Sequence, residues 1–269
     1  ARELLLPGIG AFREEIAAAA SGALGLPVRI EAIEGEWRGL RPRLRVAGLV
    51  VADAQGRPAL RLPQVDATLA WRSLLRLSPD FHRLEIVAPE LGVRRAADGR
   101  VFVAGLALGA AGERGGGLDW LLQQRELVVR DATLVWRDEL RGAPDLRLEA
   151  VAFRFERGLL RHRFALHARP PAALASRLEL RGELGRLDVT RPLESVGRLQ
   201  LALERAELGA WEVWVDYPLP LAGRGGVRAW VELDGGRTSA ITADLALDEV
   251  RTRLAPELAE LRLDRLDGR

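Results

Sequence analysis

The sequence predicts a mainly β protein: a long twisted antiparallel sheet that forms an apolar groove, with an N-terminal amphipathic helix and short interspersed helices. Apolar and polar residues alternate in many short stretches, which is typical of strands with one apolar face and one solvated face. Turns rich in glycine and proline separate these stretches. Helical spacing is confined to a few short segments, so strands dominate the prediction.

The clearest alternation lies in 146–156. Its apolar residues occupy even positions up to Leu148 and odd positions from Val151 onward, so we expect a bulge between them. After a turn at Arg157-Gly158 the alternation resumes in 162–168. Two alternating stretches joined by a short turn predict a hairpin.

Composition excludes several classes of protein. A hydrophobic content of 48% with 29% charged residues is typical of a folded chain of 269 residues. The 40 basic residues, all arginine, nearly balance 38 acidic ones, which disfavours a nucleic-acid binder. Cysteine is absent, so disulfides, thiolate nucleophiles and zinc–thiolate sites are excluded.

The first element expected is an amphipathic helix over 9–24, ended by Gly25 and Pro27. Strands are expected at 28–33, 44–52 and 59–71. No apolar run reaches the roughly 18 to 20 residues that a membrane-spanning helix needs. The chain begins without Met, and we expect its first residues to follow a membrane span.

A tryptophan among arginines lies between the expected strands. Trp37, Arg38 and Arg41 are candidates for contact with lipid headgroups, because both residue types suit a membrane interface. The alternative is a tryptophan packed over the sheet beside solvated arginines, and the general rule that charge runs are solvated favours it.

A glycine-rich segment at 105–117 predicts a flexible boundary between a region over 1–104 and a sheet region over 118–269. Within the first region we expect one helical turn at 73–76 and short strands at 84–87, 91–95 and 101–103 around the turn 97–100. The glycines are not a phosphate-binding loop, because the chain has no lysine.

The second region alternates repeatedly. After a short helix at 118–123, a strand pair is expected over 126–136 with an interruption near Arg130-Asp131. Segment 208–215 suits either a strand or a helix, and the stripe of Leu208, Trp211, Trp214 and Val215 favours the helix. Clean alternation predicts further strands at 177–184, 198–205, 227–234 and 240–247.

No catalytic constellation is visible, so we expect no enzyme and no cofactor. Of the three histidines, His162 and His167 are five residues apart on an expected strand. They therefore face opposite sides and cannot share a metal ion. His82 falls in an expected turn, and the carboxylates alternate with arginines as on solvated strand faces.

The apolar face of such a sheet must be covered. The expected helices are too few, so a second sheet, closure into a barrel or an apolar ligand would have to cover it. A strand of about seven residues is roughly 23 Å long, comparable with an extended acyl chain. The residues expected to line a lipid-binding face are Phe153, Phe155, Phe164, Leu166, Leu178, Leu180, Leu199, Leu201, Leu203, Val227, Val231 and Leu233.

A series of short motifs runs along the whole chain in a specific order: Leu4-Leu-Leu-Pro7, Gly25-Leu-Pro-Val28, Glu36-Trp-Arg-Gly-Leu-Arg-Pro42, Ser73-Leu-Leu-Arg76, Asp98-Gly-Arg100, Arg130-Asp-Ala-Thr-Leu-Val-Trp-Arg-Asp138, His162-Arg-Phe-Ala-Leu166, Arg228-Ala-Trp230 and Ala243-Asp-Leu-Ala-Leu247. Together they resemble the YhdP family within the AsmA-like superfamily. The resemblance implies a chorein-like start over 1–104, a periplasmic location and an inner-membrane anchor in a Gram-negative bacterium. It also implies a groove-shaped sheet that bridges the periplasm for phospholipids.

Two functions follow from this reading. The first is the inner-membrane-proximal segment of a bridge-like phospholipid transport protein, which conducts lipid toward the outer membrane with no covalent chemistry. The second is a periplasmic scaffold or assembly factor for outer-membrane proteins, since exposed sheet edges can recruit strands. An outer-membrane barrel is disfavoured, because aromatic residues total only 5%.

Overall fold

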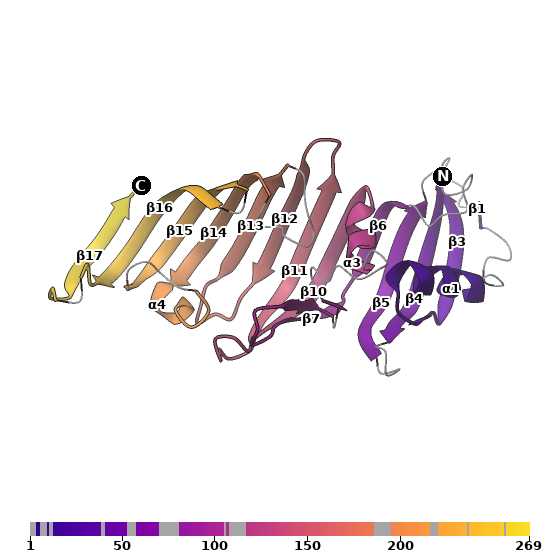
Figure 1. The fold of residues 1–269 in the computed structure, drawn as a ribbon, viewed down its shortest axis with the longest axis horizontal. Coiled ribbons are helices and arrows are strands. Elements are labelled where there is room, and N and C mark those ends of the chain that lie inside the picture. Colours follow the sequence, from indigo (N-terminus) through magenta and orange to yellow (C-terminus); the bar gives the residue numbers. More distant parts are fainter. Residues whose placement is uncertain are drawn as a thin grey trace.

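The protein is one long β-sheet with a few short helices, which confirms the predicted fold class. The computed structural model describes residues 4–5, 10, 13–38, 41–52, 58–69, 81–104, 106–107, 117–185, 195–215, 220–235, 237–255 and 257–269. In these residues seventeen strands belong to a single sheet. The strands lie side by side along the long axis, with the N-terminus near one end and the C-terminus at the other (Figure 1).

The first part of the sheet is interrupted by a helix that begins with two glutamates, Glu14 and Glu15, which suit a helix N-terminus. The helix ends where Gly25, at φ 70°, donates its N–H to the Ser21 carbonyl at 2.9 Å. The elements are β1 (Leu4–Leu5), α1 (Arg13–Leu24), β2 (Val28–Arg29), β3 (Ala32–Arg38), β4 (Arg41–Ala52), β5 (Pro58–Leu69), β6 (Phe81–Val87), β7 (Glu90–Arg95), β8 (Val101–Val103) and β9 (Leu106–Ala107).

The rest of the chain adds strand after strand to the same sheet, mostly as antiparallel neighbours. Its elements are α3 (Gly117–Gln123), β10 (Glu126–Asp138), β11 (Leu146–Arg157), β12 (His162–Arg169), β13 (Arg177–Leu184), β14 (Gly197–Glu207), α4 (Leu208–Trp211), β15 (Leu221–Asp234), β16 (Arg237–Thr252) and β17 (Leu261–Gly268).

One pairing corrects the expectation of a purely antiparallel sheet. Strands β6 and β7 follow each other along one edge of β10, and both pair with it in parallel. The register is continuous, with Leu84 opposite Leu127 and Glu90 opposite Thr133. We call this parallel junction of β6 and β7 with β10 the seam. The strands before it are joined to the strands after it by the connection that follows β7.

Bulges recur in the middle of the strands. Asp131 and Ala150, at φ 53° and 48°, interrupt β10 and β11 at adjacent places, and the bulge at Ala150 was predicted from the phase slip in the sequence. Other described residues with positive φ inside or between strands are Gly48, Ala88, Gly99, Ala104, Gly142, Arg205, Gly225, Gly235 and Glu249. A left-handed conformation costs a residue with a Cβ about 1 to 2 kcal/mol, so the sheet retains these bends against a local penalty.

The buried core begins at the N-terminal end of the sheet, where helices cover it, and the same cluster continues through β10, β11, β14 and β16. Helices α1 and α3 lie against the same side of the sheet there (Figure 1). Ile16, Ala17 and Ala20 of α1, with Leu121 and Leu122 of α3, pack against buried strand residues. Those strand residues include Ile33, Leu44, Val46, Val65, Leu84 and Ile86.

Several element boundaries differ from the sequence prediction. Residues 36–38 and 41–43, expected to lie between strands, belong to β3 and β4, which pair as far as Arg38 with Arg41. The strand pair expected over 126–136 is the single bulged strand β10. Strand β17 was not predicted, and α4 covers only the first turn of the expected helix over 208–215. The helical turn expected at 73–76 lies outside the described residues, and the domain division at 105–117 stays a prediction.

Candidate functional site

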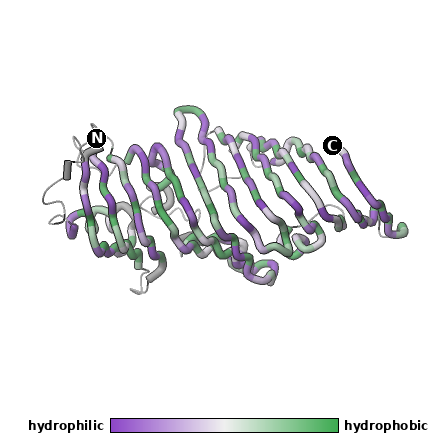
Figure 2. Tube along the Cα trace, turned by 180° about the vertical axis from the view of Figure 1, so that it is seen from behind, coloured by the Kyte–Doolittle hydropathy of each residue, from purple (hydrophilic) through white to green (hydrophobic). Residues whose placement is uncertain are grey.

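The apolar side chains of successive strands share one side of the sheet, which we call the apolar face. On β11, Leu146 and Leu148 before the bulge and Val151, Phe153 and Phe155 after it all belong to the same packed cluster. The bulge at Ala150 therefore corrects the change of phase and keeps the face continuous. Figure 2 shows hydrophobic and hydrophilic residues alternating along the strands over the length of the sheet.

The structure brings all twelve predicted lining residues together as cross-strand neighbours. Three of them, Phe155, Leu203 and Leu233, are buried, and the other nine are half-buried. Their pairs are Phe153 with Leu166, Phe155 with Phe164, Leu166 with Leu180, Leu178 with Leu203, Leu180 with Leu201, Leu199 with Val231, and Leu203 with Val227, while Leu233 lies opposite Gly197.

Four of these residues pack least tightly. Leu180, Leu199, Leu201 and Val231 are neither buried nor packed against the core cluster. Leu180 pairs with Leu201, Leu199 pairs with Val231, and both pairs share strand β14. We call these four residues the central patch. Helices α1 and α3 lie on the N-terminal half of the sheet, away from this patch (Figure 1).

Beside the central patch, a phenylalanine lies flat on the sheet. Phe164 of β12 is the direct partner of Gly182 in β13. A Cβ at Gly182 would overlap the Phe164 ring and would lie 2.9 Å from Cδ2 of Leu199. The ring therefore occupies the space that a side chain at Gly182 would take, which lowers the surface of the apolar face at this point.

One edge of the apolar face is closed by α4 and its neighbours. The buried Trp211 indole donates its Nε1–H to the Leu174 carbonyl at 3.0 Å. Trp214 donates its indole N–H to the Pro144 carbonyl at 3.1 Å, and the two rings meet edge to face at 6.1 Å. These contacts tie together three connections that lie far apart in sequence.

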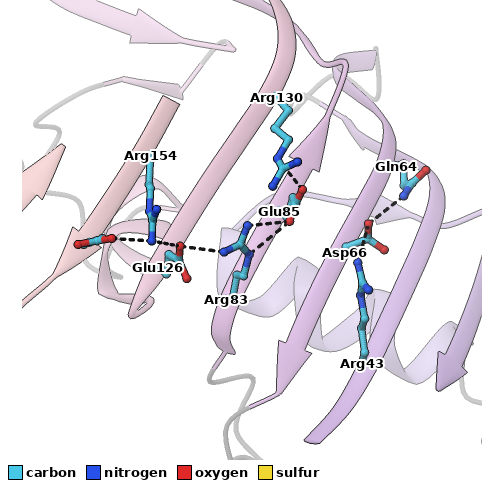
Figure 3. Close-up of polar contacts among 9 residues, drawn as sticks. Arg43, Gln64, Asp66, Arg83, Glu85, Glu126, Arg130 and Arg154 are labelled. Atoms are coloured by element: carbon cyan, nitrogen blue, oxygen red, sulfur yellow. Dashed lines mark hydrogen bonds and ion pairs between the residues drawn. The ribbon is translucent and has the colours of Figure 1, made fainter. Parts of the chain in front are cut away.

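The opposite side of the sheet, the polar face, carries ladders of arginines and carboxylates (Figure 3). Arg83 of β6 contacts Glu85 at 3.0 Å and, across the seam, Glu126 at 2.9 Å. Glu126 continues to Arg154 at 3.0 Å, and Glu85 is contacted by Arg130 at 2.8 Å. Every carboxylate of this ladder has a guanidinium partner, so the ladder stabilises the seam and offers no free acid or base.

A second ionic group lies at the end of the seam. The Asp138 carboxylate, only 1% exposed, accepts hydrogen bonds from the Arg95 guanidinium and from the Arg141 backbone N–H. Burial alone would raise the pKa of Asp138, but these hydrogen bonds outweigh it and hold the pKa below its ordinary value. Asp138 is thus an ionised structural anchor.

The histidines form no metal site. His162 stacks on Phe155 on the apolar face with ring centroids 5.9 Å apart, and burial lowers its pKa. Nδ1 of His167 lies 3.4 Å from Glu179 of the polar face, so the two histidines face opposite sides as predicted. In the described ranges no three His, Cys, Asp or Glu side chains could hold a metal ion.

The three predicted membrane-interface residues lie at the turn between β3 and β4. Arg38 pairs with Arg41 there, and Trp37 lies between Pro42 of β4 and Leu4 of β1. Their side chains are outside the described residues, so contact with a membrane stays a prediction. No helix in the described part of the chain is long and apolar enough to span a membrane.

Sequence reasoning missed part of the apolar face. Leu245 of β16 and Leu263 and Leu266 of β17 also pack against the core cluster. Leu245 lies in the alternating segment 240–247 and could have been included. Leu263 and Leu266 are three residues apart, which breaks the period of two, so the alternation did not reveal them. Gly182 carried no sequence signal of its own, because its role depends on the cross-strand register.

Comparison with known proteins gives one match. The family model described as YhdP protein matches residues 1–269, whereas no curated protein and no solved structure matches the chain. The chain therefore belongs to the YhdP family, a family of AsmA-like Gram-negative envelope proteins that is implicated in lipid transport and is not an enzyme family.

Proposed function

We propose that this YhdP-family chain is the inner-membrane-proximal segment of a bridge-like phospholipid transport protein. The apolar face would form the floor of a hydrophobic groove in which acyl chains lie, and the groove would conduct phospholipids across the periplasm toward the outer membrane. The observation that carries the proposal is the central patch, four neighbouring aliphatic side chains outside the packed core. No covalent chemistry is required.

The physical argument rests on burial of acyl chains. Removing a methylene group from water contributes about 0.8 kcal/mol, so a chain lying across several strands would be held without a polar site. The polar headgroup would remain in water at an edge of the sheet. Because the apolar face continues from strand to strand, a lipid could move along it through a series of similar contacts, each with little specificity.

The remaining predictions fit the same proposal. A membrane span before residue 1 would anchor the chain in the inner membrane, and Trp37, Arg38 and Arg41 would lie near the headgroups. The occupants are phospholipids, and the twelve predicted residues of the apolar face are the proposed lining. Asp and Arg side chains of the polar face would stay in the aqueous periplasm.

Two matched variants test the proposal. Leu201→Asp places a carboxylate in the central patch, whereas Ala202→Asp places the same carboxylate one residue away, on the polar face between Glu179 and Arg228. Each protein is purified in mild detergent and examined by native mass spectrometry with lipid extraction. We expect phospholipid to copurify with the unchanged protein and with Ala202→Asp, and to be lost from Leu201→Asp.

Circular dichroism of the same samples separates the possible failures. If Leu201→Asp unfolds the sheet, the patch is part of a sealed core and the groove is wrong. If all three proteins are folded and free of lipid, the apolar face binds something else. That result would favour the scaffold for outer-membrane proteins, in which the apolar face and sheet edges bind polypeptide.

A further inference from the structure

The hairpin between β11 and β12 ends in two exposed leucines. Its connection rises beyond the edge formed by the neighbouring strands (Figure 1). At its end Leu159 is 104% exposed and Leu160 is 86% exposed, the two highest values among the large exposed hydrophobic residues of the described chain. We call residues 158–161 the hairpin tip. Isolated exposed leucines are ordinary, but two adjacent ones at a protruding turn form a small apolar patch.

The turn itself holds the leucines outward. Gly158 donates its N–H to the Arg161 carbonyl at 3.0 Å, and a Cβ on Gly158 would overlap that oxygen. Leu159 and Leu160 therefore occupy the two central positions of a closed turn. Glycine, asparagine, aspartate, serine and proline suit such positions, because they form the turn at low cost and remain solvated. Leucine offers neither advantage, which points to a role outside the fold.

The charges around the tip are mostly positive. The stretch 157–163 contains three arginines and one histidine but no carboxylate. Beside it, on the polar face, a depression is lined by five arginines, Arg125, Arg154, Arg157, Arg161 and Arg163, together with His82, Gly158, Glu126 and Glu156. Glu183, on the neighbouring strand, pairs with Arg161 and with Arg163 at 3.1 Å. A positive excess remains, close to the two leucines.

We propose that the hairpin tip docks on the surface of an anionic phospholipid bilayer. Leu159 and Leu160 enter the boundary between headgroups and acyl chains, and the arginines beside them contact lipid phosphates. Apolar side chains next to guanidinium groups match the two layers that a bilayer surface presents. A protein partner fits less well, because a stable interface buries about 800 Å² on each side, far more than two leucines supply.

This docking is distinct from the proposed groove. The central patch would hold the acyl chains of single lipids, whereas the tip contacts an intact membrane from outside the sheet. Each can fail without the other. The chain also provides a matched control: Leu254 and Leu258, 56% and 53% exposed, lie in the connection between β16 and β17, where Arg253 is accompanied by Glu257 and Glu260.

The first test is cosedimentation with vesicles of phosphatidylglycerol and phosphatidylcholine, compared with vesicles of phosphatidylcholine alone. We expect the unchanged protein to bind the anionic vesicles and to be released as salt is raised, because exposed charges are screened. The double variant Leu159→Ser with Leu160→Ser should bind at least tenfold more weakly. The control, Leu254→Ser with Leu258→Ser, should bind as the unchanged protein does.

The second test places a probe at the tip. Because the chain has no cysteine, Leu160→Cys and Leu258→Cys each provide one site for an environment-sensitive fluorophore. We expect the emission of the probe at position 160 to shift to shorter wavelength when anionic vesicles are added, and the probe at 258 to be unchanged. The proposal is overturned if the unchanged protein does not cosediment with anionic vesicles, or if the two double variants bind these vesicles equally well. It is also overturned if the emission of the probe at position 160 does not shift.

Discussion

Two regions of the sheet use the same strand pattern but bury its apolar side chains to different extents. Around β4 to β6 the inward side chains, such as Leu44 and Leu84, are buried beneath α1 and α3. Around β13 to β15 the equivalent side chains, such as Leu201, are half-buried. Alternation therefore decides which face is apolar, whereas the packing of other elements over that face decides how deeply each side chain is buried.

The largest expected effect separates these regions directly. Leu84→Asp places an unpaired carboxylate in the buried core and should destabilise the protein by more than about 4 kcal/mol. Leu201→Asp makes the same change where water reaches the side chain and should cost at most about 1 kcal/mol. Denaturant unfolding of both variants measures the difference. Equal losses would mean that the two regions are buried alike.

The next effect concerns the covered edge of the second region. Trp211→Ala removes a buried indole and its hydrogen bond to the Leu174 carbonyl, and we expect a loss of about 3 to 5 kcal/mol. Trp214→Ala removes a half-buried indole with a comparable hydrogen bond to Pro144, so its cost should be less than half as large. Similar losses in thermal and denaturant unfolding would contradict the assignment of α4 as the closed edge.

A smaller effect tests the shape of the open region. Gly182→Ala forces the Phe164 ring off the sheet and should cost about 1 to 3 kcal/mol. Gly226→Ala, in a strand position with nothing within 4 Å of the new Cβ, should be neutral or slightly stabilising. In a Phe164→Ala background the overlapping ring is absent, so Gly182→Ala should cost less stability there than in the unchanged protein. An additive double variant would disprove the contact between ring and glycine.

The smallest effects compare the bends of the two regions. Gly48→Ala in β4 adds a Cβ at φ 61° where the Glu31 side chain already lies, and should cost at least about 1 kcal/mol. Ala150→Gly in β11 relieves the left-handed conformation and should stabilise by up to about 1 kcal/mol. Shifts of the unfolding midpoint check both signs. A destabilised Ala150→Gly variant would mean that the bend carries little strain.

Local pattern was enough to predict most strands, the bulge at Ala150 and the shared face of the twelve residues proposed to line the groove. These features depend on neighbours within a few positions, and strand periodicity carries that information. The irregularity near Asp131 was also visible in the sequence, but there it indicated a break between two strands and not a bulge within β10. The short helix at 117–123 and the turn 97–100 also followed from local composition.

The seam and the covering of the core could not be predicted in this way. Parallel pairing of Leu84 with Leu127 depends on contacts 43 residues apart, which leave no periodic trace. Phe164 rests on Gly182 only because the register of β12 and β13 aligns them. Arg83 and Glu126 likewise meet only because β6 pairs with β10. In the sequence, their alternation with apolar residues indicates only a solvated strand face.

The seam makes this chain resemble two subunits. The strands up to Arg95 and the strands from Glu126 onward meet through parallel pairing, through Arg83 with Glu126 and through Arg94 with Glu139 at 2.9 Å. The residues between them join the two parts covalently, and the contacts of the seam hold them together noncovalently. A break of the peptide chain within 108–116 would therefore convert an intramolecular contact into a heterodimer interface, and the two pieces could be produced separately and mixed to rebuild the sheet.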